Sequence, residues 1–470
     1  MNFYFFNIVL LIGRNILGPI DLIMGPIVFV FIIFVSISIY RKKYSKCDYG
    51  KYYVPAIVAK LIGTIVMSFL YQYFFKGGDT FNYFNGGSTM FETLFSMPKV
   101  GLEYYFNSTD EFSYFAKKFG SYETKGFHPY DAETLVYRIA GWLSLITFKS
   151  YLGISFIITY FSFLGSWKLY QVFIDFYPKL YKQFAYGTLF VPTILLYGGG
   201  LMKDPIIMGA IAFFTHDIYF TLIKRKGKFI NYLRMLICFY LIVIIKAYVI
   251  GMFLPPLFLW IVLSRVNKIK SPFLRKASIP IFIGVTLAGS IAISSFIGGA
   301  ISERYKLENI VESSVKIGNW IAYKTDKAGG SGYSLGKIEP TVSGMVKKIP
   351  AAINVTFFRP YIWEVKGPAY YPIVLESFLT FLFTIYVFFR VGVFRSVRLM
   401  FKHPEVLFCI SFALIFGFFV GFISSNFGAL VRYKMPCLPF YYAGLIILLS
   451  HAKRKYIIKK PKAILQPNNL

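Results

Sequence analysis

The stretch IDLIMGPIVFVFIIFVSISIY (20–40) runs directly into RKKYSKCDYGK (41–51), and the junction of the two decides the fold class. An uninterrupted apolar run of about 20 residues has the length of a helix that spans a bilayer. Basic residues gathered directly after such a run are typical of its cytoplasmic end. The junction therefore predicts a membrane-spanning helix whose C-terminal end faces the cytoplasm.

Apolar segments of the same kind recur along the chain. Together with 20–40 they predict an all-α polytopic integral membrane protein of about 11 transmembrane helices. The further segments are 53–75, 150–171, 184–200, 204–223, 229–246, 247–264, 278–299, 371–390, 405–425 and 435–450. The segment 133–148 is shorter and carries Arg138, so we interpret it as an amphipathic or interfacial helix. Whether this segment crosses the membrane stays open.

The hydrophobic content excludes several classes of protein. Of the 470 residues, 56% are hydrophobic, and they come in runs of about 20, which rules out a soluble enzyme, a secreted disulfide scaffold and a disordered chain. The four cysteines show no metal-binding spacing and are interpreted as unpaired apolar residues. No cleaved signal peptide is predicted, because the N-terminus lacks a basic region and a cleavage site of small residues.

The net charge of +30 follows from the orientation of the helices. If 41–51 is cytoplasmic and 133–148 does not span, most basic segments fall on the cytoplasmic side. They are 41–51, 172–183, 224–228, 265–276, 390–402 and the tail after 451, and they hold 26 basic residues but only the acids Asp48 and Asp175. Because this is the positive-inside pattern, the charge predicts membrane lipids as partners and requires no nucleic acid.

The chain is predicted to form a single polytopic membrane domain over 1–452, with a basic cytoplasmic tail over 453–470. Two long loops, at about 76–149 and 300–370, fall on the extracytoplasmic side and carry most of the acids. Polar residues that hydropathy does not require gather on this side as well. They are therefore the candidates for chemistry.

The first candidate is Asp79 in KGGDTFNYFNGG (76–87), directly after the second predicted span. The two preceding glycines let the backbone turn sharply and approach a ligand closely. A carboxylate at a membrane surface can act as a general base or hold a metal. The alternative is a solvated turn or a helix cap.

A second cluster lies in LLYGGGLMKDPIIMG (195–209), where glycines end one apolar run and Pro205 begins the next helix. Lys203 lies close to the membrane boundary, and a cation beside a helix N-terminus suits a phosphate. Asp204 is a further binding candidate, although a carboxylate at this position also caps the helix.

Two more clusters precede late spans. NVTFFRPYIWEVKGPAYYP contains Arg359 and Glu364, and SSNFGALVRYKMPCLPF contains Arg432 and Lys434. Arginine recognises phosphate with two parallel hydrogen bonds. The alternatives are interfacial anchoring for the first cluster and snorkelling of the cations for the second.

These candidates are far apart in the sequence but fall on one predicted face. We expect Asp79, Lys203, Arg359, Arg432 and Lys434 to surround one cavity that opens to the outer leaflet. The cations would neutralise a lipid-linked phosphate or pyrophosphate, and the carboxylate would activate an acceptor hydroxyl. Because the lipid phosphate is the leaving group, no nucleotide site is required on this face.

Other ionisable residues lie within apolar runs. Glu376 and the pair His216–Asp217 would form a proton path in a transporter, or alternatively a buried hydrogen-bonded group. Arg234 and Lys60 are expected to snorkel to the inner face.

The layout resembles polytopic bacterial glycosyltransferases of the GT-C type and the related Wzy-like polysaccharide polymerases. The resemblance rests on GGDTFNYF, GGGLMKDP, FFRPYIWE and NFGALVRYKMP. In GT-C enzymes an acidic residue of the first outer loop is usually the catalytic base, and Asp79 matches it. The chain lacks the acidic doublet of that loop, which leaves metal dependence open. Wzy-like polymerases rely on outer-side arginines, which Arg359 and Arg432 match.

The leading hypothesis is a multi-pass glycosyltransferase or glycan polymerase of the bacterial inner (cytoplasmic) membrane. It would transfer a sugar from a polyprenyl-(pyro)phosphate-linked donor to a glycan acceptor on the extracytoplasmic face, in envelope polysaccharide or glycoconjugate synthesis. Asp79 would be the catalytic base, with a divalent cation left open as cofactor. Substrate would be bound by Lys203, Asp204, Arg359, Glu364, Arg432 and Lys434. The alternatives are a transporter or flippase of lipid-linked glycans and a non-catalytic membrane scaffold.

Overall fold

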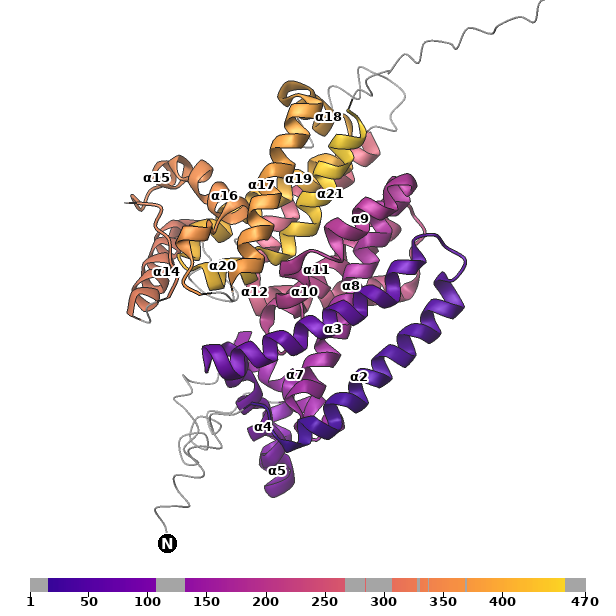
Figure 1. The fold of residues 1–470 in the computed structure, drawn as a ribbon, viewed down its shortest axis with the longest axis vertical. Coiled ribbons are helices and arrows are strands. Elements are labelled where there is room, and N and C mark those ends of the chain that lie inside the picture. The colour runs from indigo at the N-terminus through magenta and orange to yellow at the C-terminus, as the bar shows by residue number, and fades with distance from the viewer. Residues whose placement is uncertain are drawn as a thin grey trace, which may run out of the picture.

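The computed structural model describes residues 16–106, 132–266, 307–327, 330–336, 338–367 and 370–452, together with Gly284. Within these residues the regular elements are all helices and there is no strand, apart from an isolated β-bridge between Gly332 and Asn426. The predicted all-α class is therefore confirmed (Figure 1). The tail 453–470, parts of both long outer loops and the predicted span 278–299, except for Gly284, lie outside the described residues.

In chain order, the helices of the bundle have the following bounds. The first half contains α2 (Pro19–Ile39), α3 (Tyr53–Phe69), α4 (Asp79–Ser96), α5 (Pro98–Phe106), α7 (Ala132–Thr147), α8 (Tyr151–Phe176), α9 (Tyr181–Thr188), α10 (Pro192–Tyr197), α11 (Lys203–Ile218) and α12 (Phe229–Val266). The second half contains α14 (Leu307–Lys327), α15 (Val342–Lys347), α16 (Ile349–Phe358), α17 (Tyr371–Val391), α18 (Val393–Lys402), α19 (Pro404–Ile423), α20 (Phe427–Lys434) and α21 (Leu438–Ser450).

Seven helical segments among the described residues are long and apolar enough to cross a membrane, so the chain is a multi-pass membrane protein. They are Pro19–Tyr44, Gly50–Phe75, Tyr151–Phe176, Lys203–Ile223, Phe229–Val266, Tyr371–Val391 and Pro404–Ile423. The expected number of 11 is not confirmed.

Part of the difference between the expected and the observed number of spans has local causes. The predicted span 184–200 is divided into α9 and α10, because Pro192 lacks an amide hydrogen and begins a new helix at its first position. The two predicted spans 229–246 and 247–264 correspond to the two helical parts of α12, which meet at a kink where Lys246 has a non-helical backbone (φ −150°, ψ 76°), and together they count as one segment. The last predicted span is a helix of 13 residues, α21, that follows a short 3₁₀ turn.

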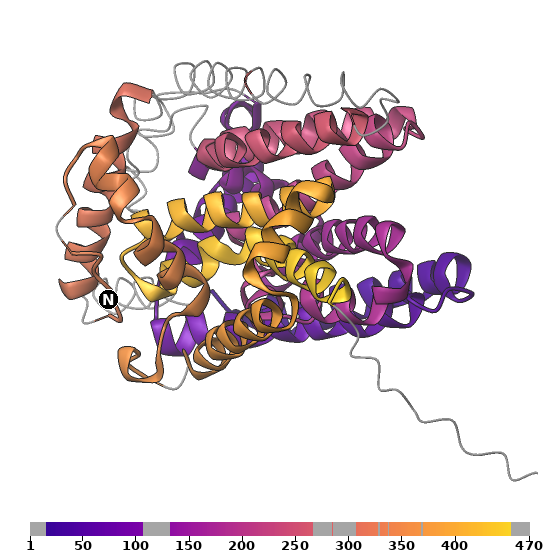
Figure 2. The same ribbon diagram turned by 90° about the horizontal axis from the view of Figure 1, so that it is seen from above.

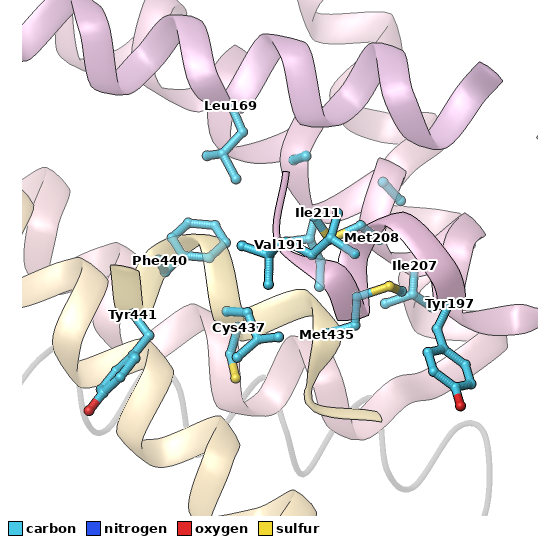
Figure 3. Packing of buried hydrophobic residues seen from close by; sticks show 14 of the residues in the cluster. Leu169, Val191, Tyr197, Ile207, Met208, Ile211, Met435, Cys437, Phe440 and Tyr441 are labelled. Carbon is cyan, nitrogen blue, oxygen red and sulfur yellow. The ribbon is translucent and has the colours of Figure 1, made fainter. Parts of the chain in front are cut away.

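The centre of the bundle is the crossing of α8 and α11. A Cβ atom added to Gly165 of α8 would lie 2.4 Å from the carbonyl oxygen of Gly209 in α11, so the two backbones touch. Small residues at such a crossing let membrane helices approach closely. Figure 3 shows the neighbouring core, where Leu169 of α8, Ile207 and Ile211 of α11, and Phe440 of α21 lie together.

The outer helices enclose this crossing. Seen from above, α12 lies on one side of the bundle and α2 and α3 lie on the opposite side (Figure 2). Helix α2 is attached through Asp21, whose carboxylate accepts hydrogen bonds from the Ser150 hydroxyl at 2.7 Å and the Leu152 amide at 2.8 Å. The outward face of α2 exposes large apolar side chains, as a helix in contact with lipid does.

The helix α7 corresponds to the segment 133–148, which was interpreted as an amphipathic or interfacial helix. It packs along α4, and a Cβ atom on Gly87 of α4 would lie 2.5 Å from Cβ of Ala140 in α7. Helices α4 and α7 lie with α5 at the lower end of the bundle in Figure 1. This end carries the candidate site described next.

Candidate functional site

Asp79 and Arg432 form an ion pair although 353 residues separate them in the sequence. Asp79 is the first residue of α4, and the turn before it depends on Gly78, whose φ of +119° suits glycine. Arg432 lies in α20, and its Nη1 is 3.1 Å from Oδ2 of Asp79. The Asp79 side chain is 51% exposed and that of Arg432 is 15% exposed. A covered guanidinium thus holds a carboxylate that faces outward.

The surroundings of Arg432 favour its charged form. Burial alone would lower the pKa of Arg432, but Tyr71, Asp79, Tyr433 and Asp204 together raise it well above its ordinary value. Apart from Asp79, Nη1 makes only a weak 3.9 Å contact with Sδ of Met202 within the described residues. Because a guanidinium has five N–H donors, Arg432 retains donors for a further anion.

Lys203 extends this cluster. Its ammonium lies 3.7 Å from Oε1 of Glu133 in α7 and 5.6 Å from the centre of the Tyr83 ring. Tyr83 is one turn after Asp79 on α4, so the two side chains share a face of the helix. Burial, and secondarily the charge of Asp79, raises the pKa of Tyr83 well above its ordinary value. The phenol therefore stays protonated beside Lys203.

The position of Lys203 is fixed by the three glycines before α11. The amide of Gly200, a residue with φ of +88°, donates a 3.0 Å hydrogen bond to Oγ1 of Thr159. A Cβ atom on Gly199 would lie 2.1 Å from Oγ1 of Thr64, so no side chain fits there. The glycine turn is thus packed into the groove between α3 and α8, and this holds the start of α11 in place.

Beneath the surface pair lies a second, buried ion pair. Asp204 of α11 binds Lys246, whose ammonium also stands 3.9 Å from the centre of the Tyr433 ring in α20. Both side chains are buried, and together they join α11, the break in α12, and α20. The sequence interpretation placed Lys246 in a connection between two spans but did not name it as a site residue, although a lysine between two apolar runs was a signal for it.

Arg359 and Glu364 bind each other at the opposite end of α20. Nε of Arg359 lies 2.9 and 3.0 Å from the two carboxylate oxygens of Glu364. The guanidinium also lies 5.6 Å from the ring centre of Phe427, the first residue of α20. Arg432 follows Phe427 by five residues, about 7.5 Å along the helix. Helix α20 therefore links the two predicted arginines.

Lys434 is not on the exposed surface beside Asp79, where we expected it. Its side chain is 1% exposed, and burial lowers its pKa, against the attraction of Glu376. Glu376 in α17 is buried as well and accepts hydrogen bonds of 2.6 and 2.8 Å from the amide and hydroxyl of Thr193. Of the five residues expected around one cavity, Asp79, Lys203 and Arg432 form one cluster, Arg359 is paired separately, and Lys434 points into the protein.

The intramembrane residues are hydrogen-bonded. Asp217 accepts from Arg234 at 2.6 and 2.5 Å and from Asn231 at 2.6 Å, and it lies 2.8 Å from Nδ1 of His216. The expectation that Lys60 snorkels to the inner face is wrong, whereas for Arg234 the structure shows only its partner. Arg234 turns to Asp217, and the buried Lys60 donates a 2.8 Å hydrogen bond to Ser162, because α8 packs over it.

No group of three or more His, Cys, Asp or Glu side chains suited to a metal occurs within the described ranges. No family model matches the chain, and neither a curated protein nor a solved structure matches it. The resemblance to GT-C enzymes and Wzy-like polymerases therefore rests on the sequence motifs alone.

Proposed function

We propose that the chain is a membrane glycosyltransferase or glycan polymerase that uses a polyprenyl-(pyro)phosphate-linked sugar donor in envelope glycan synthesis. The observation that supports this most is the ion pair in which the covered Arg432 holds the exposed Asp79 at one end of the bundle. A carboxylate and cations placed together at a membrane boundary provide the two functions that this transfer requires.

The reaction would divide between these groups. The acceptor hydroxyl oxygen forms a bond to the anomeric carbon of the donor sugar, while Asp79 accepts the hydroxyl proton. The bond between the anomeric carbon and the phosphate oxygen breaks, and the lipid phosphate leaves with the electron pair. Arg432 and Lys203 stabilise the negative charge on that phosphate. Arg359, which is bound to Glu364, would contact the donor or acceptor from the far end of α20.

A flippase of lipid-linked glycans is the second candidate, and an apolar cavity favours it. The cavity has a volume of about 550 Å³ and lies between α9, α10, α17 and α21, with Glu376 and Thr380 in its wall. Its lining is mainly apolar, which suits an isoprenoid chain. Glu376→Gln would then abolish transport of the lipid in vesicles and leave any sugar transfer intact.

The first prediction tests the transferase. In lipid bilayers that contain a polyprenyl-linked donor, Asp79→Asn is expected to lower turnover about 100-fold or more, because it removes the base. Arg432→Lys keeps the charge but loses the planar fork, and should lower turnover to a smaller extent. Turnover is followed by the release of the polyprenyl phosphate.

Glu92→Gln is the matched control. Glu92 is an exposed glutamate of the same helix and pairs with Lys149 away from the cluster. This variant is expected to turn over like the wild type. Full activity of Asp79→Asn would show that Asp79 is not the base. If no variant of the cluster alters donor turnover, the cluster is not the site of transfer.

A further inference from the structure

A second charged cavity lies at the opposite end of the bundle from Asp79. It has a volume of about 850 Å³ and is bounded by the end of α8 and by three connections, those between α2 and α3, between α8 and α9, and between α11 and α12. Phe220 in its wall follows Lys203 by 17 residues on one continuous helical segment, which is about 25 Å along the axis. The cavity is therefore separate from the site proposed for sugar transfer.

Most of the charged side chains that line this cavity are lysines. Lys168, Lys179, Lys226 and Lys228 line it, against the acids Asp48 and Asp175. Asp175 is already neutralised, since it lies 2.8 Å from the ammonium of Lys224 and accepts a 2.5 Å hydrogen bond from Tyr219. None of the four lining lysines forms an ion pair within the described part of the chain, so the cavity carries an excess of positive charge.

Among the four lysines, Lys168 is the strongest indication of an anion site. It lies on α8 and is half-buried, whereas the other lysines are on connecting segments. The nearby carboxylate of Asp217 is occupied by Arg234, Asn231 and His216. A cation at this depth in a membrane protein is costly without a counter-charge. No carboxylate of the described residues forms an ion pair with this ammonium, which leaves it open to an anion in the cavity.

The rest of the lining suits an organic anion. Tyr49, Tyr181 and Phe220 supply ring faces, and Gln171 and Asn231 supply amide groups. The volume exceeds what a single phosphate group needs and lies in the range of small-molecule sites.

We propose that this cavity binds a phosphate-bearing organic anion, with Lys168 at its inner end and Lys226 and Lys228 at its mouth. The anion could be the head group of an acidic phospholipid or a soluble phosphate ester, since both present the same chemistry to the lysines. The proposal does not depend on the sugar-transfer function, because it concerns other residues and the other end of the bundle.

The experiment uses two probes on the full-length protein. ADP is titrated calorimetrically into protein held in nanodiscs of phosphatidylcholine, and phosphatidic acid retention is measured by native mass spectrometry after mixed-lipid exchange. At least one probe is expected to bind, and Lys168→Met and Lys226→Ala should each weaken its binding about tenfold or more. Binding of ADP identifies a soluble ligand, and retention of phosphatidic acid without ADP binding identifies a lipid.

Two controls keep the test decisive. Lys402→Ala removes an exposed lysine of α18 that does not line the cavity, and it should bind both probes like the wild type. Lys168→Arg keeps the charge and should retain binding, which separates lost charge from lost folding. If neither probe binds, or if Lys402→Ala weakens binding as much as Lys226→Ala, the cavity is not an anion site. Should Lys168→Met fail to fold, Lys226→Ala and Lys228→Ala still give the answer.

Discussion

The two ion pairs at the start of α4 and α11 differ in how much solvent they meet, and this difference sets their roles. Asp79 is half exposed, so its bond to Arg432 contributes little to stability, about 0–1 kcal/mol. Such a pair can open for a substrate with little loss of free energy. Asp204 and Lys246 are both buried, and a buried pair is broken only with a large loss of stability. The first pair suits a reactive site and the second suits a structural joint.

The buried pair gives a prediction about stability. Lys246→Met leaves the carboxylate of Asp204 buried without its partner, and is expected to lower the free energy of unfolding by about 3–5 kcal/mol. The double variant Asp204→Asn with Lys246→Met should lose less, because no uncompensated charge remains. Unfolding in mixed micelles, followed by tryptophan fluorescence, measures both values.

Lys316→Met provides the comparison for that experiment. Lys316 forms an exposed pair with Glu312 on α14, so its replacement should hardly alter unfolding. If Lys246→Met is as stable as Lys316→Met, the pair with Asp204 is not the joint between α11 and α12.

At the scale of helices, the contact between α8 and α11 depends on Gly165 and Gly209. Gly165→Ala places a Cβ atom against the backbone of α11, and overpacking of this kind costs about 1–3 kcal/mol. The variant should therefore unfold at a lower temperature than the wild type. Gly318→Ala is the matched change in a helix with room, since its nearest neighbour would be 3.5 Å away, and it should be neutral or stabilising. Equal unfolding temperatures for the two variants would contradict the close crossing.

The sequence predicted the long helices well and the broken ones poorly. The segments 20–40, 53–75 and 371–390 correspond to α2, α3 and α17, because a long apolar run between polar ends admits few other structures. The division of 184–200 was not predicted, whereas the break at Lys246 between the two helical parts of α12 was expected from the sequence. The division before Pro192 depends on neighbouring helices that shield the interrupted backbone from lipid, and hydropathy does not contain that information.

For the candidate site, too, the sequence predicted local features but not those that depend on tertiary packing. Asp79, Lys203 and Arg432 were identified singly by being polar beside apolar runs, and the structure brings them into one cluster. The partner of Asp204 was missed, because Lys246 is 42 residues away and only packing brings it near. Residue type and local position thus identified the charges, while the pairing of each charge required the tertiary structure.

At the scale of the whole molecule, the two charged ends define an orientation that can be measured. Among the four cysteines, Cys47 is partly exposed and lies at the lysine-rich end, whereas Cys238, Cys409 and Cys437 are buried. Under the positive-inside pattern, a membrane-impermeant maleimide should label Cys47 in inside-out vesicles and not in intact cells.

A cysteine at the other end should behave in the opposite way. Glu92→Cys places a thiol on the exposed face of α4, and in a Cys47→Ser background it should be labelled in intact cells. Labelling of Cys47 from outside together with labelling of Glu92→Cys from inside would reverse the orientation, and would put Asp79 on the cytoplasmic face.

The buried pair between Asp204 and Lys246 also bears on how the chain enters the bilayer during synthesis. The helices α11 and α12 emerge from the ribosome one after the other, joined by the short basic segment 224–228. A lone aspartate or lysine in an apolar helix opposes its transfer from the translocon into lipid. Because the two charges neutralise each other within this hairpin, we expect the helices to insert as a unit. A glycosylation reporter that finds α11 inserted equally well with Lys246→Met would show instead that each helix enters by itself.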